Sequence, residues 1–272
     1  MDLLHEPHGL HHHILKTLGE MDHGTPFYPE GISQSSSSSA VLFLLGRYPS
    51  RAGDSSRTCV VFNKRSQKVR QPGDLCFPGG RIATRLDSTL ARLLPLPLLP
   101  LQGWSYWSLW RAQRPREARR LALLLATSLR ESLEEMRLNP LGVKFLGPLP
   151  SEELVMFGRI LYPLVGWITR QKHFFPNWEV EKIIYVPLQD LLKPENYARY
   201  RLRFLGQDKG EGATQDFPAF VYRKDNEEEV LWGVTYRIVT IFLKIVFDFM
   251  PPPMESLSVV LGTRGEDYYN PT

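Results

Sequence analysis

Three glutamates close together in the chain are the residues whose types and spacing best suit chemistry. Glu131, Glu134 and Glu135 occupy positions i, i+3 and i+4, so a helix would project all three carboxylates from one face within one turn. A solvated acidic face is the ordinary interpretation of this pattern. The alternative is a site for Mg²⁺ or Mn²⁺, because hard divalent cations prefer carboxylate oxygens and bridge them to phosphates. The helix alone does not decide between the two.

The element that must position these carboxylates is a helix from Pro115 to about Leu138. Pro115 suits the first turn of a helix, and Asn139-Pro140 would stop it. Strand-like segments lie on both sides of this helix, at 40–46, 58–65, 142–149, 160–168 and 181–188. The first two flank a turn, which predicts an antiparallel hairpin. Two further helices are predicted at 9–21 and 234–250. Strands around a central helix predict an α/β sandwich.

Length and composition limit the classes of protein to consider. With 272 residues and 43% hydrophobic residues, the chain can bury one large core or two small ones. Its net charge of +4 is spread without a dense basic block, which favours a polyanionic small molecule over nucleic acid as partner. Two cysteines suit neither a disulfide framework nor zinc. With no signal-like start and no apolar run long enough for a membrane span, we expect a cytoplasmic protein without a transmembrane segment.

Two sequence motifs carry a resemblance to a known family. The pieces "FPGG" and "LRESLEEM" together resemble the signature of the Nudix hydrolases, in which a glycine loop leads into a helix bearing R-E-x-x-E-E. Upstream, "FNKRSQKVRQPGDLCFPGG" is similar to the accessory motif of the coenzyme A diphosphatase branch, with matches at Arg65, Ser66, Arg70 and Gly73. Two linked motifs are much more specific than either alone.

The resemblance implies a fold, an activity and a set of site residues. The fold would be a Nudix-type α/β/α sandwich with a mixed sheet over 40–250, with an N-terminal extension (1–39), an insertion at about 88–122 and a C-terminal tail (251–272). The activity would be Mg²⁺- or Mn²⁺-dependent hydrolysis of the diphosphate of coenzyme A or an acyl-CoA to 3′,5′-ADP and a 4′-phosphopantetheine product. The implied catalytic residues are Arg130, Glu131, Glu134, Glu135 and Glu179, with Glu131, Glu134 and Glu135 as metal ligands. The implied substrate-binding residues are Arg65, Arg70, Phe77, Gly79 and Gly80.

Several alternatives stay open. The substrate could be another nucleoside diphosphate derivative, such as NADH or ADP-ribose, or the chain could be a catalytically silent binding module. Glu179 is either a base or metal ligand, or a surface carboxylate. Arg65 and Arg70 either bind coenzyme A phosphates or lie on the surface near the hairpin. A homodimer is an alternative to a monomer, and a solvated helix face is favoured over metal binding for His11 to His13.

The chain also departs from the family pattern. Gly80 and Arg130 are 50 residues apart, where the signature has 14, so the motif would be split by a Leu-, Pro- and Trp-rich insertion. We expect this insertion to bulge outward and to be dispensable for chemistry, with Trp104, Trp107 and Trp110 packing onto the domain rather than forming an exposed stripe. The usual acidic residue six positions after the second glycine is Leu86, and Asp87 follows it. The glycine that usually ends the helix is Arg137, so we expect Asn139-Pro140 to end it without a left-handed residue.

Overall fold

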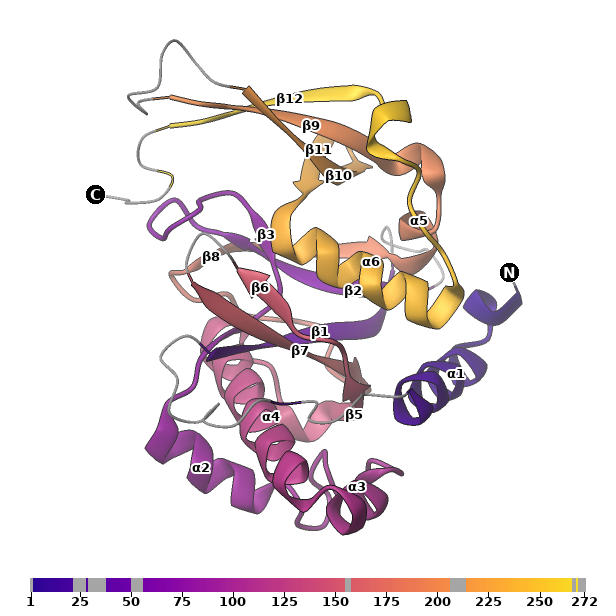
Figure 1. Cartoon of the computed structure of the whole chain (residues 1–272), viewed down its shortest axis with the longest axis vertical. Helices are drawn as coiled ribbons and strands as arrows, with labels where there is room; N and C mark the ends of the chain where they lie inside the picture. Colours follow the sequence, from indigo (N-terminus) through magenta and orange to yellow (C-terminus); the bar gives the residue numbers. More distant parts are fainter. Residues whose placement is uncertain are drawn as a thin grey trace.

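A mixed β-sheet with helices on both faces forms the centre of the molecule (Figure 1). The computed structural model describes residues 2–21, 28, 38–49, 56–154, 158–205, 214–265 and 268. The strands of the central sheet are β1 (Ser38–Pro49), β2 (Ser56–Arg65), β3 (Leu75–Cys76), β4 (Gly79–Arg81), β5 (Val143–Pro148), β6 (Glu152–Leu154), β7 (Arg159–Ile168) and β8 (Val180–Pro187). Their order is β3-β2-β1-β7-β5, with β4 paired to β1, β6 to β7 and β8 to β2. β1 and β7 are parallel, whereas β1 and β2 form the predicted antiparallel hairpin.

The two faces of β1 show how the sheet organises the core. Because side chains alternate along a strand, one set of β1 residues faces the helix α4 (Pro115–Met136), and these are Ala40, Leu42 and Leu44. The other set packs towards α1 (Pro7–Glu20) and α6 (Gly233–Phe247), and these are Val41, Phe43 and Leu45. All six side chains are buried. The predicted α/β/α sandwich with a mixed sheet is therefore confirmed.

The end of α4 differs from the prediction. Arg137 adopts a left-handed conformation with φ 57°, and its N–H donates to the carbonyl of Leu133 at 3.0 Å. Leu138 then turns back, donates to the carbonyl of Ser132 at 3.3 Å and is fully buried. These gains offset the roughly 1–2 kcal/mol that a left-handed non-glycine residue costs. The expectation that Asn139-Pro140 would end the helix without a left-handed residue was wrong.

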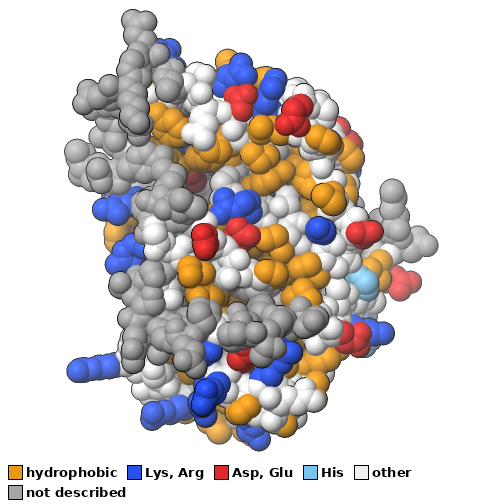
Figure 2. Space-filling model, viewed as in Figure 1, with side chains coloured by type: hydrophobic (Ala, Val, Ile, Leu, Met, Phe, Trp, Pro, Cys, Tyr) orange, Lys and Arg blue, Asp and Glu red, His pale blue; other side chains and the backbone are white. Residues whose placement is uncertain are grey.

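The insertion forms two short helices that pack against the domain. α2 (Thr84–Leu93) and α3 (Trp107–Gln113) both contact α4. Trp104, Trp107 and Trp110 are buried in the core on this face of the sheet, and the indole N–H of Trp104 donates to the carbonyl of Leu146 at 3.2 Å. The packing interpretation of the tryptophans is confirmed, whereas the expected outward bulge was wrong, because the apolar residues of the insertion are needed to cover α4 and β5. Figure 2 shows basic side chains gathered along the lower margin of the molecule, where α2 and α4 lie.

A second sheet was not foreseen from the sequence. It has the order β11-β10-β9-β12 and lies above α6 in Figure 1, and its strands are β9 (Tyr197–Phe204), β10 (Thr214–Lys224), β11 (Glu227–Leu231) and β12 (Val259–Arg264). The short helix α5 (Leu188–Leu191) follows β8. β12 belongs to the segment expected as a C-terminal tail, and it pairs in parallel with β9. Most of the link between α1 and β1 lies outside the described residues. No described helix is both long and apolar enough to span a membrane.

The C-terminal residues reach back to the start of β3. The Asp74 carboxylate accepts hydrogen bonds from Arg264 Nη2 at 2.9 Å, from Trp232 Nε1 at 3.1 Å and from the Tyr268 hydroxyl. Tyr268 also accepts the backbone N–H of Gln71 at 2.7 Å through its carbonyl. The loop that carries the accessory motif is therefore held by residues almost 200 positions away.

Candidate functional site

The glycine loop and the carboxylate helix meet in space. A Cβ atom placed on Gly80 would lie 2.5 Å from Cδ of Glu131, so glycine at this position lets the carboxylate stay where it is. Gly79 has φ +150° and no space for a side chain either, because an added Cβ would lie 2.3 Å from the carbonyl oxygen of Ala40. Next to them, Arg130 Nη2 donates to the carbonyl of Arg81 at 3.1 Å. The two motifs therefore form one unit in spite of their separation in the chain.

A buried ion pair joins α2, the helix that leads into the insertion, to this unit. Arg130 donates through Nε to Oδ1 of Asp87 at 2.7 Å and through Nη2 to Oδ2 at 3.2 Å. Asp87 is fully buried on α2, and the Thr127 hydroxyl donates to its Oδ2 at 2.9 Å. Burial alone would lower the pKa of Arg130, but hydrogen bonds and charge from Asp87, together with Glu131, raise it, so the guanidinium stays charged. Asp87 thus supplies a carboxylate at this point, whereas Leu86 is exposed.

The three glutamates of α4 lie in different environments. Arg130 bridges two of them, with Nη2 2.9 Å from Glu131 Oε1 and Nη1 3.1 Å from Glu134 Oε2. Glu134 is half exposed, whereas Glu135 turns inwards and accepts a 2.7 Å hydrogen bond from Asn63 Nδ2. Burial, with repulsion from Glu131 and Glu179, raises the pKa of Glu135 to about 8. Burial also raises the pKa of Glu131, although Arg130 opposes the shift.

Sequence reasoning missed Asn63. It lies on β2 after three apolar residues and is fully buried, with its Nδ2 on Glu135. A buried amide needs hydrogen-bond partners, so a polar side chain at the end of an apolar strand was the available signal. Its Oδ1 has no hydrogen-bond partner among the described residues.

Glu179 is brought to the same place by the loop before β8. The backbone N–H of Asn177 donates to the carbonyl of Glu135 at 2.8 Å, which ties this loop to the end of α4. The Glu179 carbonyl accepts the N–H of Ser66 at 2.8 Å, which ties the same loop to the accessory motif. These two hydrogen bonds hold the loop that carries Glu179 between the end of α4 and the accessory motif.

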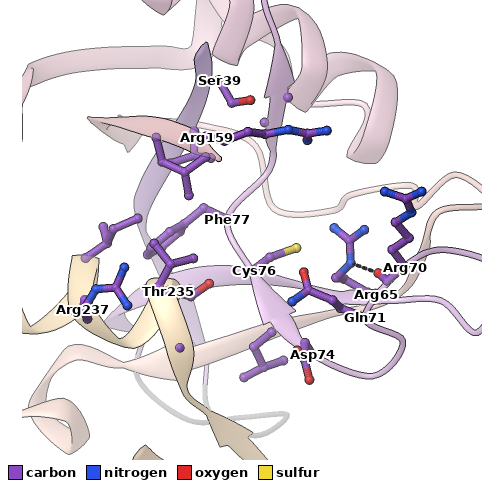
Figure 3. Close-up of a pocket in the computed structure, with 18 of the residues that line it drawn as sticks. Ser39, Arg65, Arg70, Gln71, Asp74, Cys76, Phe77, Arg159, Thr235 and Arg237 are labelled. Atoms are coloured by element: carbon purple, nitrogen blue, oxygen red, sulfur yellow. Dashed lines mark hydrogen bonds between the residues drawn. The ribbon is translucent and has the colours of Figure 1, made fainter. Parts of the chain in front are cut away.

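A cavity of about 710 Å³ opens beside the glycine loop (Figure 3). The predicted residues that line it are Arg65, Arg70, Phe77, Gly79, Gly80 and Glu179. Arg65 also donates through Nε to the carbonyl of Arg70 at 2.6 Å, and Phe77 also packs 4.7 Å from Phe43, so both have structural contacts as well. Arg65 and Arg70 lie on one side of the cavity in Figure 3, and Arg237 lies on the other. The α4 carboxylates are not among the lining residues, and Glu131 reaches the edge of the cavity only at Gly80.

Curated Nudix hydrolases are similar to parts of this chain. A chloroplastic Nudix hydrolase 22 of Arabidopsis thaliana is 31% identical over 135 residues, which are 47% of this chain and 41% of that protein. The peroxisomal coenzyme A diphosphatase NUDT7 of Mus musculus is 27% identical over 154 residues, 55% of this chain and 49% of the relative. The Nudix hydrolase NudL of Pectobacterium atrosepticum is 31% identical over 117 residues, 43% and 55% of the two chains. The chain is homologous to the Nudix hydrolases. It spans about half the length of the curated relatives it matches.

Family models and solved structures say less about the family of this chain than the curated relatives do. No family model matches the chain. A Nudix hydrolase structure from Nitrosomonas europaea superposes with a TM-score of 0.39 at 11% identity, over 85% of this chain and 81% of that one. The Nudix domain of Shewanella oneidensis NrtR with ADP ribose gives 0.34 at 13% identity, over 65% and 84%. Both scores are low, so the fold assignment rests on the strand order and helix layers described above.

The glycine loop at Gly79 and Gly80 and the glutamates of α4 together correspond to the Nudix signature and are called the Nudix box below. Their fit to a divalent cation depends on the donor atoms that they offer. These donors are carboxylate oxygens, which suit a hard cation. Burial, with a smaller contribution from neighbouring carboxylates, raises the pKa of Glu135, and a cation beside it would favour the ionised form. Among the described residues, no group of three or more His, Cys, Asp and Glu side chains already converges on one point. Arg130 instead forms ion pairs with Glu131 and Glu134. The residue types therefore fit the cation, and its binding would require these two side chains to rearrange.

Proposed function

We propose that this chain is a divalent-metal-dependent hydrolase of the diphosphate bond in coenzyme A or an acyl-CoA. The observation that carries the proposal is the approach of Gly80 to Glu131, because it assembles a glycine loop and a carboxylate helix into one Nudix box across 50 residues. The homology to Nudix hydrolases supports the same chemistry. The name of the mouse relative, a coenzyme A diphosphatase, supports the choice of substrate.

Glu131, Glu134 and Glu135 would hold the cation, Mg²⁺ or Mn²⁺. When bound, such a cation supplies charge neutralisation at the diphosphate and a more acidic water. Arg130 fixes Glu131 and Glu134 through its fork of N–H donors and is itself fixed by Asp87, so its role is to position carboxylates rather than to touch the substrate.

Two glutamates are candidates for the general base. Glu135 has a pKa of about 8 and can accept a proton near neutral pH when its charge is partly balanced. Glu179 lines the cavity, and this supports a role beside a substrate bound there. Asn63 donates to Oε2 of Glu135 and so orients this carboxylate.

The lining of the cavity suits a substrate that contains phosphate groups as well as an apolar part. Arg65 and Arg70 offer positive charge on one side, and planar guanidinium groups suit phosphate oxygens. Apolar and aromatic residues, with Phe77, Phe217 and Trp232 among them, form part of the remaining lining, beside further charged residues such as Arg159 and Arg237. Coenzyme A combines a phosphorylated adenosine with a long pantetheine arm, and this combination matches a cavity with both kinds of wall.

A substrate panel tests the proposal. The purified chain would be assayed with coenzyme A, an acyl-CoA, NADH and ADP-ribose, each with Mg²⁺, with Mn²⁺ and with EDTA. We expect cleavage of the coenzyme A compounds to 3′,5′-ADP, loss of activity in EDTA, and a fall of at least about 100-fold in Glu134→Gln. If the protein preferred NADH or ADP-ribose, the proposed diphosphate hydrolysis would stand, but coenzyme A would no longer be the proposed substrate. If the folded protein turned over none of these compounds, the result would favour a catalytically silent binding module.

The other expectations stay predictions. Cytoplasmic location would be tested by cell fractionation, since the named relatives include a chloroplastic and a peroxisomal protein. Self-association would be tested by sedimentation of the purified chain. Lack of affinity for nucleic acid, and the domain limits at 40 and 250, would be tested by gel shift and by limited proteolysis.

A further inference from the structure

A basic groove lies beside the first turn of α1, away from the cavity. It consists of two adjoining pockets of about 520 and 380 Å³ that share Pro7, Arg47 and Ser56. The basic residues that line it are His8, His11, Arg47, Arg57, Lys144, Arg170 and Lys172. These residues come from α1, from the end of β1, from the starts of β2 and β5, and from the segment after β7. Residues far apart in the chain therefore converge on one concavity.

The positive charge of this groove is not balanced by the chain as far as it is described. No described Asp or Glu lines either pocket, and Glu6, which precedes Pro7, is not in the lining. Lys144, Arg170 and Lys172 have no ion pair or side-chain hydrogen bond with a described residue. Arg47 is used in part, because its Nη2 donates to the carbonyl of Ser56 at 2.6 Å. Like charges held together repel each other, so an anion from solution would be attracted here.

His11 adds a buried polar atom to the groove. Its ring packs edge-on against Trp167 at 5.4 Å, and its Nε2 is buried without a hydrogen-bond partner among the described residues. Burial lowers the pKa of His11, and the charge of Lys144 and of the neighbouring histidines lowers it further. A buried ring nitrogen without a partner is unfavourable, and a ligand oxygen would satisfy it. His11 is therefore not on the solvated helix face that its sequence pattern favoured.

We propose that this groove binds a soluble, multiply charged phosphate compound at a site separate from the cavity. The two sites are at opposite ends of one strand: Leu161 lines the cavity, and Trp167 lines the groove six residues further along β7, or about 20 Å. A phosphate compound fits better than an elongated polyanion, because the cations surround a pocket rather than form a stripe along a face. Several phosphate groups would be needed to engage cations from both pockets.

Binding of inorganic tripolyphosphate tests this site. Calorimetry in EDTA would be done with the wild-type chain and with the triple variant Lys144→Gln, Arg170→Gln, Lys172→Gln. All three side chains are exposed, so the variant should fold with an unchanged Tm. We expect its affinity for tripolyphosphate to be at least about tenfold lower, and the wild-type affinity to fall as salt is added. Hydrogen exchange should show protection by tripolyphosphate at residues 143–148 and 165–172 in the wild type only.

A matched control removes the same number of charges elsewhere. Arg85→Gln, Arg92→Gln, Arg111→Gln changes three exposed arginines on α2 and α3, none of which lines the groove. It should bind tripolyphosphate as the wild type does. Equal weakening in both triple variants would overturn the proposal, because it would show a general effect of net charge. Protection limited to residues 65–81 would assign the ligand to the cavity and also overturn it. Binding to vesicles with anionic lipid without binding to free tripolyphosphate would replace the proposal with a membrane contact.

Discussion

Asp87 and Arg130 form a two-point ion pair across 43 residues of chain, with atoms 2.7 and 3.2 Å apart. Asp87 is fully buried and Arg130 nearly so. The pair therefore fixes α2 against α4 at the turn that carries Glu131 and Glu134.

Asp87→Asn should destabilise the protein and lower its activity together. The change leaves a nearly buried arginine without its main partner, and breaking a buried pair in this way costs on the order of 3 kcal/mol. The free energy of unfolding by urea would measure the effect. Asp190→Asn is the control, because Asp190 pairs with the more exposed Lys193 at 2.7 Å and should cost less than about 1 kcal/mol. A stable, fully active Asp87→Asn variant would contradict the role assigned to the pair.

Gly80→Ala should separate activity from stability. The added Cβ would meet the carboxylate of Glu131, which can swing away because it is the end of a flexible side chain. We therefore expect a change in unfolding free energy below about 1 kcal/mol but a fall in turnover of about tenfold or more, since misplaced catalytic groups are costly. Gly142→Ala, with no atom within 4 Å of the added Cβ, should leave turnover unchanged. Equal turnover in the two variants would show that the position of Glu131 is not important.

Glu135→Gln should stabilise the metal-free protein at alkaline pH. The pKa of Glu135 is about 8 in the fold and 4.5 in the unfolded chain, so the folded state holds its proton more tightly. The carboxyl group therefore lowers stability progressively from about pH 4.5 to 8, and fully above pH 8. One pKa unit corresponds to about 1.4 kcal/mol, so the gain at pH 9 should exceed that value and vanish near pH 4. Thermal unfolding in EDTA at several pH values would measure it, and a gain that does not depend on pH would contradict it.

Neither cysteine should react readily at pH 8. Burial raises the pKa of Cys59 to about 12, with a contribution from Asp190, and burial raises that of Cys76 to about 11. Because only the thiolate reacts, a pKa two units above its ordinary value lowers the rate by about 100-fold. Modification by a disulfide reagent would be compared in native protein and in guanidinium chloride. Rapid reaction of one equivalent in the native protein would show that a thiol is less buried than described.

Trp104→Ala should destabilise the protein strongly, because the insertion is part of the core. Trp104 is buried against Phe145 at 5.0 Å, and removing a buried tryptophan costs about 3–5 kcal/mol. Leu98→Ala is the control within the same segment, since Leu98 is 93% exposed and should change stability by less than about 0.5 kcal/mol. Similar stabilities for the two variants would restore the idea of a dispensable bulge.

The sequence predicted α4 better than its surroundings. The i, i+3, i+4 spacing of the glutamates and the strand-like segments follow local periodicity, so α4, the hairpin and the sandwich could be predicted. The left-handed Arg137 could not be, because its strain is offset by burial of Leu138, a tertiary effect. Asn63 and Asp74 act through partners 72 and 190 residues away. Such long-range pairs leave no local pattern. The same holds for β12, which pairs with a strand some 60 residues earlier, whereas β10 and β11 form a local antiparallel hairpin that sequence reasoning overlooked.

The left-handed end of α4 has a consequence for the charge of the site. Glu134 and Glu135 lie in the last turn of a 22-residue helix, where the macrodipole is negative, and that turn holds no basic residue. Carboxylates at this end are disfavoured, whereas a cation there is favoured by about 0.3–1 kcal/mol. The backbone of α4 and its glutamates thus attract positive charge to the same place. The insertion lengthens α4 only at its N-terminal end, at Pro115, so it leaves this C-terminal end where it is.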